Sequence, residues 1–235
     1  MKGQLILGFA LVCFGVASCQ QGEVKKSDFK TQKDSVSYTI GISVGKSLKK
    51  DAIEIEPNFL IQGINDAIAK DSSYYLTDAE MQKVMMNLQT QMMKKQMDKM
   101  KAEGDVNKKA GDEFLEKNKS EKGVVVLPSG LQYRVLQSGT GAQPKATDKV
   151  KCHYKGTLIN GNEFDSSIKR GEPATFAVTG VIKGWTEALQ LMHVGDKWQL
   201  FIPPQLGYGE QGAGQGQIPP QATLIFEVEL LGIEK

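Results

Sequence analysis

Apolar side chains recur at helical spacing from Ser35 to about Lys119. Residues four apart share one face of an α-helix. The first such set is Val36, Ile40, Val44 and Leu48. Proline is favoured in the first turn of a helix, so a second helix is expected to begin at Pro57. Its apolar set is Phe59, Leu60, Ile64 and Ile68. The pattern predicts two short helices, each with one apolar face.

A third, longer helix is expected to begin at Asp78. Thr77 and Glu80 have the spacing of a capping box, which satisfies backbone N–H groups at a helix start. The apolar stripe continues at Met81, Val84, Met85, Leu88 and Met92. Gly104 and Gly111 follow and are expected to be weak points, because glycine is a poor helix former.

From Val124 onward, alternation with a period of two replaces the helical spacing. Leu131, Tyr133 and Val135 alternate with polar residues, which predicts a half-exposed strand. The pair Asn160-Gly161 lies between two apolar runs and predicts a β-hairpin.

The last long strand is expected from Thr223 to Leu231, with Phe226, Val228 and Leu230 on one face. A short helix is expected from about Gly184 to Met192. Strands gathered after a helical half predict an α+β protein, with an antiparallel sheet and one short helix in its C-terminal domain.

The long helix has more apolar surface than two short helices of the same chain can cover. Dimerisation through residues 35–122 is the expected solution. A small monomeric bundle is the alternative, since helical faces can also be covered internally. Methionine adapts to varied partners, so contact with unfolded client chains is a further alternative, although a dimer core explains most of the methionines better.

The composition leaves room for two modest domains and argues against nucleic-acid binding. The 235 residues are 40% hydrophobic, and 29 basic and 27 acidic residues give a formal charge of +2. Such a balance provides no field that would attract a polyanion. His153 and His193 are the only histidines, and neither begins a metal-ligand spacing. The glycine-rich stretch 207–216 lacks the lysine of a phosphate-binding loop, so neither metal nor cofactor is expected.

The N-terminus has the three zones of an export signal: Lys2, the apolar run 5–16, and small residues before Cys19. The run is too short to span a bilayer comfortably, and a buried core segment is the alternative. Val16-Ala-Ser-Cys19 resembles a bacterial lipobox, which implies a signal peptide of residues 1–18 and a lipid on Cys19. The polar residues 19–34 then form a flexible tether. We expect a lipid-anchored protein of the bacterial cell envelope, with Gln20 resembling an outer-membrane sorting signal.

Cys152 is the cysteine that remains once Cys13 leaves with the signal and Cys19 is acylated, so no disulfide is expected in the mature chain. It shares its parity along the strand with Val150 and Tyr154, which predicts a buried core thiol.

Six of the aromatic residues in the C-terminal half have little catalytic chemistry near them: Tyr154, Phe164, Phe176, Trp185, Tyr208 and Phe226. With Asp165 as the nearby carboxylate, they indicate an apolar pocket rather than an acid, base or nucleophile site. Simpler roles remain for each. The aromatics are often plain core, Tyr208 could pack its own glycine-rich turn, and Asp165 could cap a turn.

Five ordered segments resemble the FKBP-type peptidyl-prolyl cis-trans isomerases. They are Val150-Lys-Cys-His-Tyr-Lys-Gly156, Gly161-Asn-Glu-Phe-Asp-Ser-Ser167, Val181-Ile-Lys-Gly-Trp185, Gly207-Tyr-Gly209 and Ile218-Pro-Pro-Gln-Ala-Thr-Leu-Ile-Phe226. With the helical region upstream, the chain is similar to the lipid-anchored or periplasmic bacterial branch, which includes the macrophage infectivity potentiator proteins. The resemblance implies a curved sheet wrapped around a short helix in residues 123–235, and a V-shaped homodimer joined by the N-terminal helices.

The resemblance also implies the roles of the pocket residues. Trp185 would be the floor, and the walls would be Tyr154, Phe164, Phe176, Val181, Ile218 and Phe226. The backbone N–H of Ile182 and the hydroxyl of Tyr208 would each bind a substrate carbonyl. Asp165 would sit at the rim near Tyr154 and orient the twisted amide electrostatically.

The chain departs from the family pattern at Ala174, where many members have a pocket-edge aromatic, and at Gln217, where an apolar residue is common. These positions bear on substrate preference and on affinity for macrolide inhibitors more than on activity itself.

The expected function is isomerisation of X-Pro bonds in proline-containing polypeptides, assisting the folding of exported proteins. The rival from another class is a non-catalytic holdase, in which the pocket and the methionines grip unfolded chains.

Overall fold

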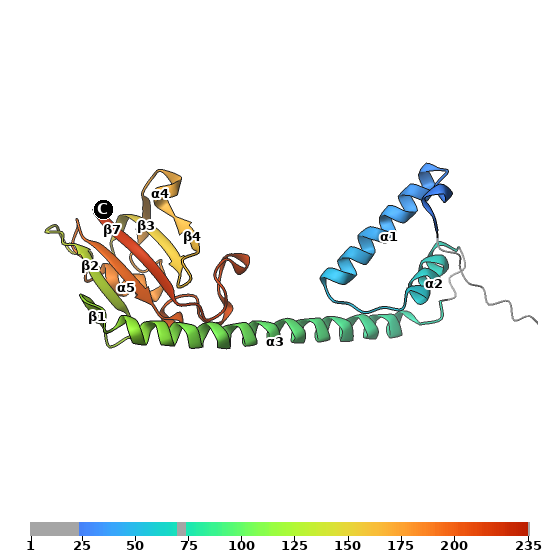
Figure 1. Ribbon diagram of the computed structural model, residues 1–235, viewed down its shortest axis with the longest axis horizontal. Helices are drawn as coiled ribbons and strands as arrows, with labels where there is room; N and C mark the ends of the chain where they lie inside the picture. Colours follow the sequence, from blue (N-terminus) through green and yellow to red (C-terminus); the bar gives the residue numbers. More distant parts are fainter. Residues whose placement is uncertain (1–23, 70–73, 235) are drawn as a thin grey trace, which may run out of the picture. The chain divides into compact units, whose positions relative to one another are not determined.

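The computed structural model describes residues 24–69 and 74–234. The chain divides into two compact units, Met1–Thr77 and Asp78–Lys235 (Figure 1). The expected signal peptide and the lipid on Cys19 lie outside the described residues.

The first unit contains two helices, α1 (Gln32–Lys50) and α2 (Pro57–Ile68), after a short 3₁₀ turn, η1 (Lys26–Asp28). α1 begins before the predicted Ser35, because Thr31 and Asp34 form a capping box that the apolar pattern did not reveal. α2 begins at Pro57 as predicted. No residue of α1 or α2 is buried, so neither apolar face is covered by the described residues of its own unit.

The second unit begins with α3 (Asp78–Asn118), a helix of 41 residues that starts where the sequence predicted. Its buried residues are Gly104, Gly111, Leu115 and Asn118. The helix continues without a break through Gly104 and Gly111, the two positions expected to be weak points. Both lie against the C-terminal domain, where tertiary contacts outweigh the low helix propensity of glycine.

Seven antiparallel strands form one sheet after α3, in the order β1-β2-β6-β7-β3-β4, with β5 also paired to β3. The strands are β1 (Val124–Val126), β2 (Gln132–Gln137), β3 (Lys149–Leu158), β4 (Glu163–Ser166), β5 (Ala174–Ala177), β6 (Lys197–Ile202) and β7 (Leu224–Glu234). The predicted hairpin at Asn160-Gly161 joins β3 to β4. The α+β fold class is confirmed.

Two short helices complete the domain, α4 (Ser167–Arg170) and α5 (Lys183–Leu189). α5 ends earlier than the predicted Met192. Trp185, Ala188 and Leu189 of α5 are buried with the inward side chains of β7, and Figure 1 shows α5 lying across the concave side of the sheet. The predicted alternation of β7 is confirmed. The short 3₁₀ turns η2 (Pro204–Leu206), η3 (Gly209–Gln211) and η4 (Gly214–Gly216) lie between β6 and β7.

Cys152 on β3 is fully buried, as its parity predicted. Burial raises the pKa of its thiol to about 12, so the sulfur stays protonated and unreactive at neutral pH.

The alternation predicted for β2 holds only in part. Gln132, expected on the exposed face, is buried, whereas Val135 is exposed. The Gln132 side chain accepts a hydrogen bond from Asn118 (2.8 Å) and donates one to the Leu115 carbonyl (3.0 Å). These bonds tie the end of α3 to the sheet and satisfy polar groups that burial would otherwise leave unpaired.

Candidate active site

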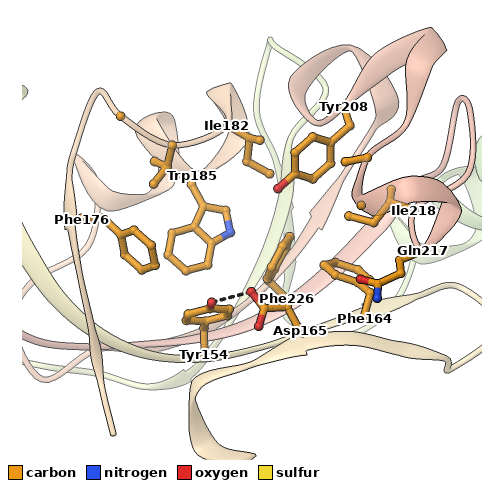
Figure 2. A pocket seen from close by; sticks show the side chains of 14 residues that line it. Tyr154, Phe164, Asp165, Phe176, Ile182, Trp185, Tyr208, Gln217, Ile218 and Phe226 are labelled. Atoms are coloured by element: carbon orange, nitrogen blue, oxygen red, sulfur yellow. Dashed lines mark hydrogen bonds between the residues drawn. The ribbon is translucent and has the colours of Figure 1, made fainter. Parts of the chain in front are cut away.

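A pocket of about 650 Å³ opens between α5, the sheet and the segment that precedes β7. Every residue that the sequence placed in the pocket lines it: Tyr154, Phe164, Asp165, Phe176, Val181, Ile182, Trp185, Tyr208, Ile218 and Phe226. Gly180, Ala213, Gly214 and Gln217 complete the lining. Figure 2 shows their side chains converging on one hollow.

The sheet brings these residues together from distant parts of the chain. In register, Gly156 of β3 lies between Asp165 of β4 and Phe226 of β7. Tyr154 lies two residues before Gly156 and therefore faces the same side of the sheet. β5 adds Phe176 from its pairing with Val150. Neighbours across strands therefore build the wall opposite α5.

Trp185 of α5 is held by rings on three sides and is only 3% exposed. Its indole meets Tyr154, Phe176 and Phe226 edge-on, with ring centroids 5.3, 5.6 and 5.3 Å away. Such T-shaped pairs are favoured by the aromatic quadrupole and add to the energy of burial. The indole is therefore a fixed floor for the pocket (Figure 2).

Two side chains, Tyr154 and Arg170, bind the Asp165 carboxylate, and the sequence pattern did not indicate Arg170. The Tyr154 hydroxyl donates a hydrogen bond of 2.6 Å to its carboxylate, and the Arg170 guanidinium forms a salt bridge with it. Arg170 also donates to the Tyr154 hydroxyl at 2.7 Å. α4 turns the chain back toward β3, so Arg170 contacts Tyr154 although the two residues are 16 positions apart. The carboxylate is thereby fixed at the rim and is not a simple turn cap.

These contacts shift the pKa values of the rim away from neutrality. Burial raises the pKa of Asp165, but the hydrogen bonds from Tyr154 and Arg170 outweigh it, so the net pKa is lowered. Burial, and then the hydrogen bond to Asp165, raise the pKa of Tyr154. Burial and the nearby Asp165 charge raise the pKa of Tyr208. At neutral pH the titratable residues of the lining are thus one carboxylate and two neutral phenols.

Two donors on the α5 side remain available to a ligand. The Ile182 N–H finds no acceptor within residues 24–69 and 74–234, whereas its carbonyl accepts bonds from the N–H groups of Trp185 and Thr186. Tyr208 is 40% exposed, and Figure 2 shows its hydroxyl directed into the hollow. Both donors lie above an apolar floor, so a carbonyl bound there would be shielded from bulk water.

The two departures from the family pattern fall in different places. Ala174 of β5 pairs with Cys152 of β3 and does not line the pocket. Gln217 does line it, beside Ile218. Only the Gln217 departure adds a polar group to the wall.

In the part of the chain that the structure describes, no group of three or more His, Cys, Asp or Glu side chains is arranged to hold a metal ion. His153 contacts Ser167 Oγ at 3.1 Å, and Ser167 in turn bonds the backbone of Tyr154. Both residues serve the packing of β3 against α4.

Comparison with known protein families gives two matches that together span most of the chain. Residues 140–231 match the family described as FKBP-type peptidyl-prolyl cis-trans isomerase. Residues 33–135 match the domain found amino-terminal to FKBP-type peptidyl-prolyl isomerases.

Individual relatives are similar over nearly their whole lengths. The chain is 49% identical to the peptidyl-prolyl cis-trans isomerase Mip of Coxiella burnetii, over 88% of this chain and 89% of the relative. It is 45% identical to the outer membrane protein MIP of Legionella longbeachae, with 87% of each chain covered. Among solved structures, FkpA from Escherichia coli aligns with a TM-score of 0.69 at 39% identity, covering 88% of this chain and 98% of that one.

We predict that replacing Arg170 with Met raises the pKa of Asp165 toward 3.8, its ordinary value. The parent carboxyl has a lowered folded-state pKa, so the stability it contributes is present above 3.8 and is lost as pH falls through the lower folded-state value. The pH dependence of the Asp165 carboxyl carbon resonance, measured by NMR, gives the pKa of Asp165 in the parent and in Arg170→Met. Lys169→Met, one residue away and paired with Glu163 instead, is the matched control. Equal Asp165 midpoints in parent and Arg170→Met would contradict the assignment.

Proposed function

Because this chain belongs to the FKBP-type peptidyl-prolyl cis-trans isomerases and is an isomerase of that class, we propose that its ring-lined pocket binds proline and lowers the barrier to X-Pro rotation without proton transfer. The observation that carries the proposal is the convergence of Trp185, Tyr208, Asp165 and the Ile182 N–H on one hollow.

The reaction requires little covalent chemistry. Twisting an amide removes its resonance, which gives a barrier of about 18 to 20 kcal/mol. No bond is broken, and the twisted amide has less charge separation than the planar one. Moving it from water to an apolar site therefore costs less than moving the planar amide, so the pocket stabilises the twisted state selectively.

Trp185 and its neighbours provide that apolar site. The proline ring would lie on the indole, between Phe226 and the Tyr208 side of the pocket. Each 1.36 kcal/mol of selective stabilisation is worth about a factor of ten in rate. A modest preference for the twisted amide is thus enough for effective catalysis.

The polar groups at the edge hold the substrate in place. The Ile182 N–H would bind the carbonyl on one side of the proline, and the Tyr208 hydroxyl would bind another. Asp165, kept ionised by Tyr154 and Arg170, would orient the rotating carbonyl electrostatically. Since Tyr154 and Arg170 hold Asp165 before substrate binds, little is lost in ordering this carboxylate.

Proline-containing polypeptides are the substrate class, and the comparisons favour isomerisation over a purely non-catalytic holdase. An apolar macrolide would compete for the same pocket, and Gln217 would place a polar amide against it. The folding of exported proteins is the proposed physiological task.

The first unit supports the proposal of a homodimer. Phe59 and Ile68 of α2 are 79% and 75% exposed, and most apolar side chains of α1 are exposed as well. Exposed apolar stripes of this kind mark an interaction surface. A second copy of the same helices is the proposed partner, which agrees with the match to a domain that precedes this type of isomerase.

The proposed location is the bacterial cell envelope, with a lipid on Cys19 as the anchor. One relative is named an outer membrane protein. Within residues 24–69 and 74–234, no helix is both long and apolar enough to cross a bilayer.

Trp185→Leu is expected to lower kcat/KM for an X-Pro tetrapeptide about tenfold or more, because the floor of the pocket is lost. Trp198→Leu is the matched control. Trp198 is also a buried tryptophan of this domain, but it stacks on Tyr133 and is not part of the pocket lining. A protease-free cis-to-trans assay on folded protein measures both variants. Equal losses of kcat/KM in the two variants would show that the Trp185 indole contributes only to stability. If the parent did not accelerate isomerisation above the uncatalysed rate, the proposed function would be refuted.

A fragment that begins at Lys101 is expected to be monomeric, whereas the chain from residue 20 is expected to be dimeric. The fragment keeps the buried part of α3, from Gly104 to Asn118, so its fold should be retained. Multi-angle light scattering gives the two masses, and circular dichroism confirms folding. A dimeric fragment would contradict assembly through the N-terminal helices.

A further inference from the structure

The last third of α3 has one face that is covered by the C-terminal domain. Gly104, Asn107, Gly111, Leu115 and Asn118 recur at spacings of three and four and are buried or partly buried, which places them on a single helical face. No residue of α3 before Gly104 is buried. Within this unit, the buried stripe of α3 therefore consists of two glycines, two asparagines and Leu115.

Part of this stripe touches the segment Pro219–Thr223, directly before β7. A Cβ at Gly104 would lie 3.3 Å from Gln221 Cγ and 3.4 Å from Pro220 Cβ, and a Cβ at Gly111 would overlap Thr223 Oγ1. The two glycines thus allow the helix backbone to come close to the segment. Between them, the Asn107 side chain donates a hydrogen bond of 2.9 Å to the Pro220 carbonyl.

The same segment is tied to the wall of the catalytic pocket. The Gln221 N–H bonds the Gly209 carbonyl at 2.8 Å, next to Tyr208. Ala213 and Ile218 exchange backbone hydrogen bonds of 2.9 and 3.1 Å, so the loop is closed on itself. Tyr208, Ala213, Gly214, Gln217 and Ile218 of the loop line the pocket. Pro220 and Gln221 contact α3, and Figure 1 shows this segment next to the helix.

Gln221 itself has a backbone conformation that requires support. Its φ is +56°, in the left-handed region that non-glycine residues rarely adopt. Such strain persists only where neighbouring contacts hold it. The contacts available are the Gly209 carbonyl within the loop and α3 on the outside, through Gly104 and Asn107.

We propose that Asn107 is a positioning residue of the isomerase site. By holding the Pro220 carbonyl, Asn107 fixes the position of the loop 207–221. This loop carries Ile218 on one wall of the pocket, the loop wall. Its position therefore sets the distance from Ile218 to the aromatic rings on the opposite wall. α3 then sets how large a side chain the pocket accepts beside the proline. This inference rests on the proposed site, because it gives α3 a role only if the loop wall touches substrate.

The test compares Asn107→Ala and Asn107→Asp with Lys109→Ala in the full mature chain. Alanine favours a helix more than asparagine does, so Asn107→Ala does not weaken α3 by its own propensity. Asp has the same shape as Asn but, when ionised, cannot donate to the Pro220 carbonyl. Lys109 is exposed on the same helical turn and controls for changes in α3 that do not reach the loop. The readout is the ratio of kcat/KM for peptides with Leu and with Gly before the proline.

Both Asn107 variants are expected to lower this Leu-to-Gly ratio about threefold or more, because a loosened wall loses contact with the larger side chain. Partial unfolding would lower both rates by one factor and leave the ratio unchanged, so a stability effect cannot imitate the result. A parental ratio in the Asn107 variants, or the same change in Lys109→Ala, would overturn the inference. Ile218→Ala distinguishes failure of the Asn107 proposal from failure of the proposed substrate site. If Ile218→Ala alters the Leu-to-Gly ratio and the Asn107 variants do not, the substrate site is supported and the role of Asn107 is refuted. If neither alters it, the loop wall itself has no part in substrate binding.

Discussion

The edge-on packing of aromatic rings around Trp185 is the interaction on which the site depends. Three rings fix the indole at centroid distances of 5.3 to 5.6 Å, so the floor is formed before any substrate arrives. An amide that twists there would lie against aromatic rings in place of water. Preorganisation of this kind spares the reaction the cost of rearranging solvent, and it explains why a pocket with one fixed carboxylate can serve as an enzyme site.

The antiparallel sheet makes this packing possible because it gathers rings that are far apart in the sequence. β3 is the central element, since β4, β5 and β7 all pair with it. Tyr154 on β3 contributes a ring that packs against the Trp185 floor and a hydroxyl that bonds Asp165 at the rim. One residue of β3 therefore contacts both the apolar floor and the polar rim. On the opposite side, the loop before β7 closes the pocket and rests on α3, so the connecting helix belongs to the architecture of the site as well as to the region upstream.

Local signals allowed several elements to be predicted from the sequence. The starts of α2 at Pro57 and α3 at Asp78 follow from first-turn proline and capping patterns, and the alternation of β7 follows from its period of two. From the residues alone, the spaced aromatics indicated an apolar pocket. The assignment of each residue to a wall came from the resemblance of ordered motifs, and the structure places all of them around one hollow.

What the sequence did not reveal depends on contacts across the fold. Arg170 reaches Tyr154 and Asp165 only because α4 turns the chain back. Gln132 is buried because α3 covers that end of β2 and supplies its hydrogen-bond partners. Gly111 looks like a helix weakness by propensity, yet it lies where α3 and Thr223 come closest. In each case tertiary context reverses a local preference, which no pattern of neighbours along the chain can show.

The central claim is that rotation is catalysed by a dry, fixed surface and not by transfer of a proton. The most direct test is kcat/KM for an X-Pro peptide from about pH 5 to about pH 9, repeated in heavy water. The titratable groups of the lining have pKa values below 3.8 or above 10, so the profile should be flat across this range, and the solvent isotope ratio should be about 1. The account would be contradicted if kcat/KM changed with an apparent pKa near neutral pH for two different peptides and the solvent isotope ratio were about 2 or more.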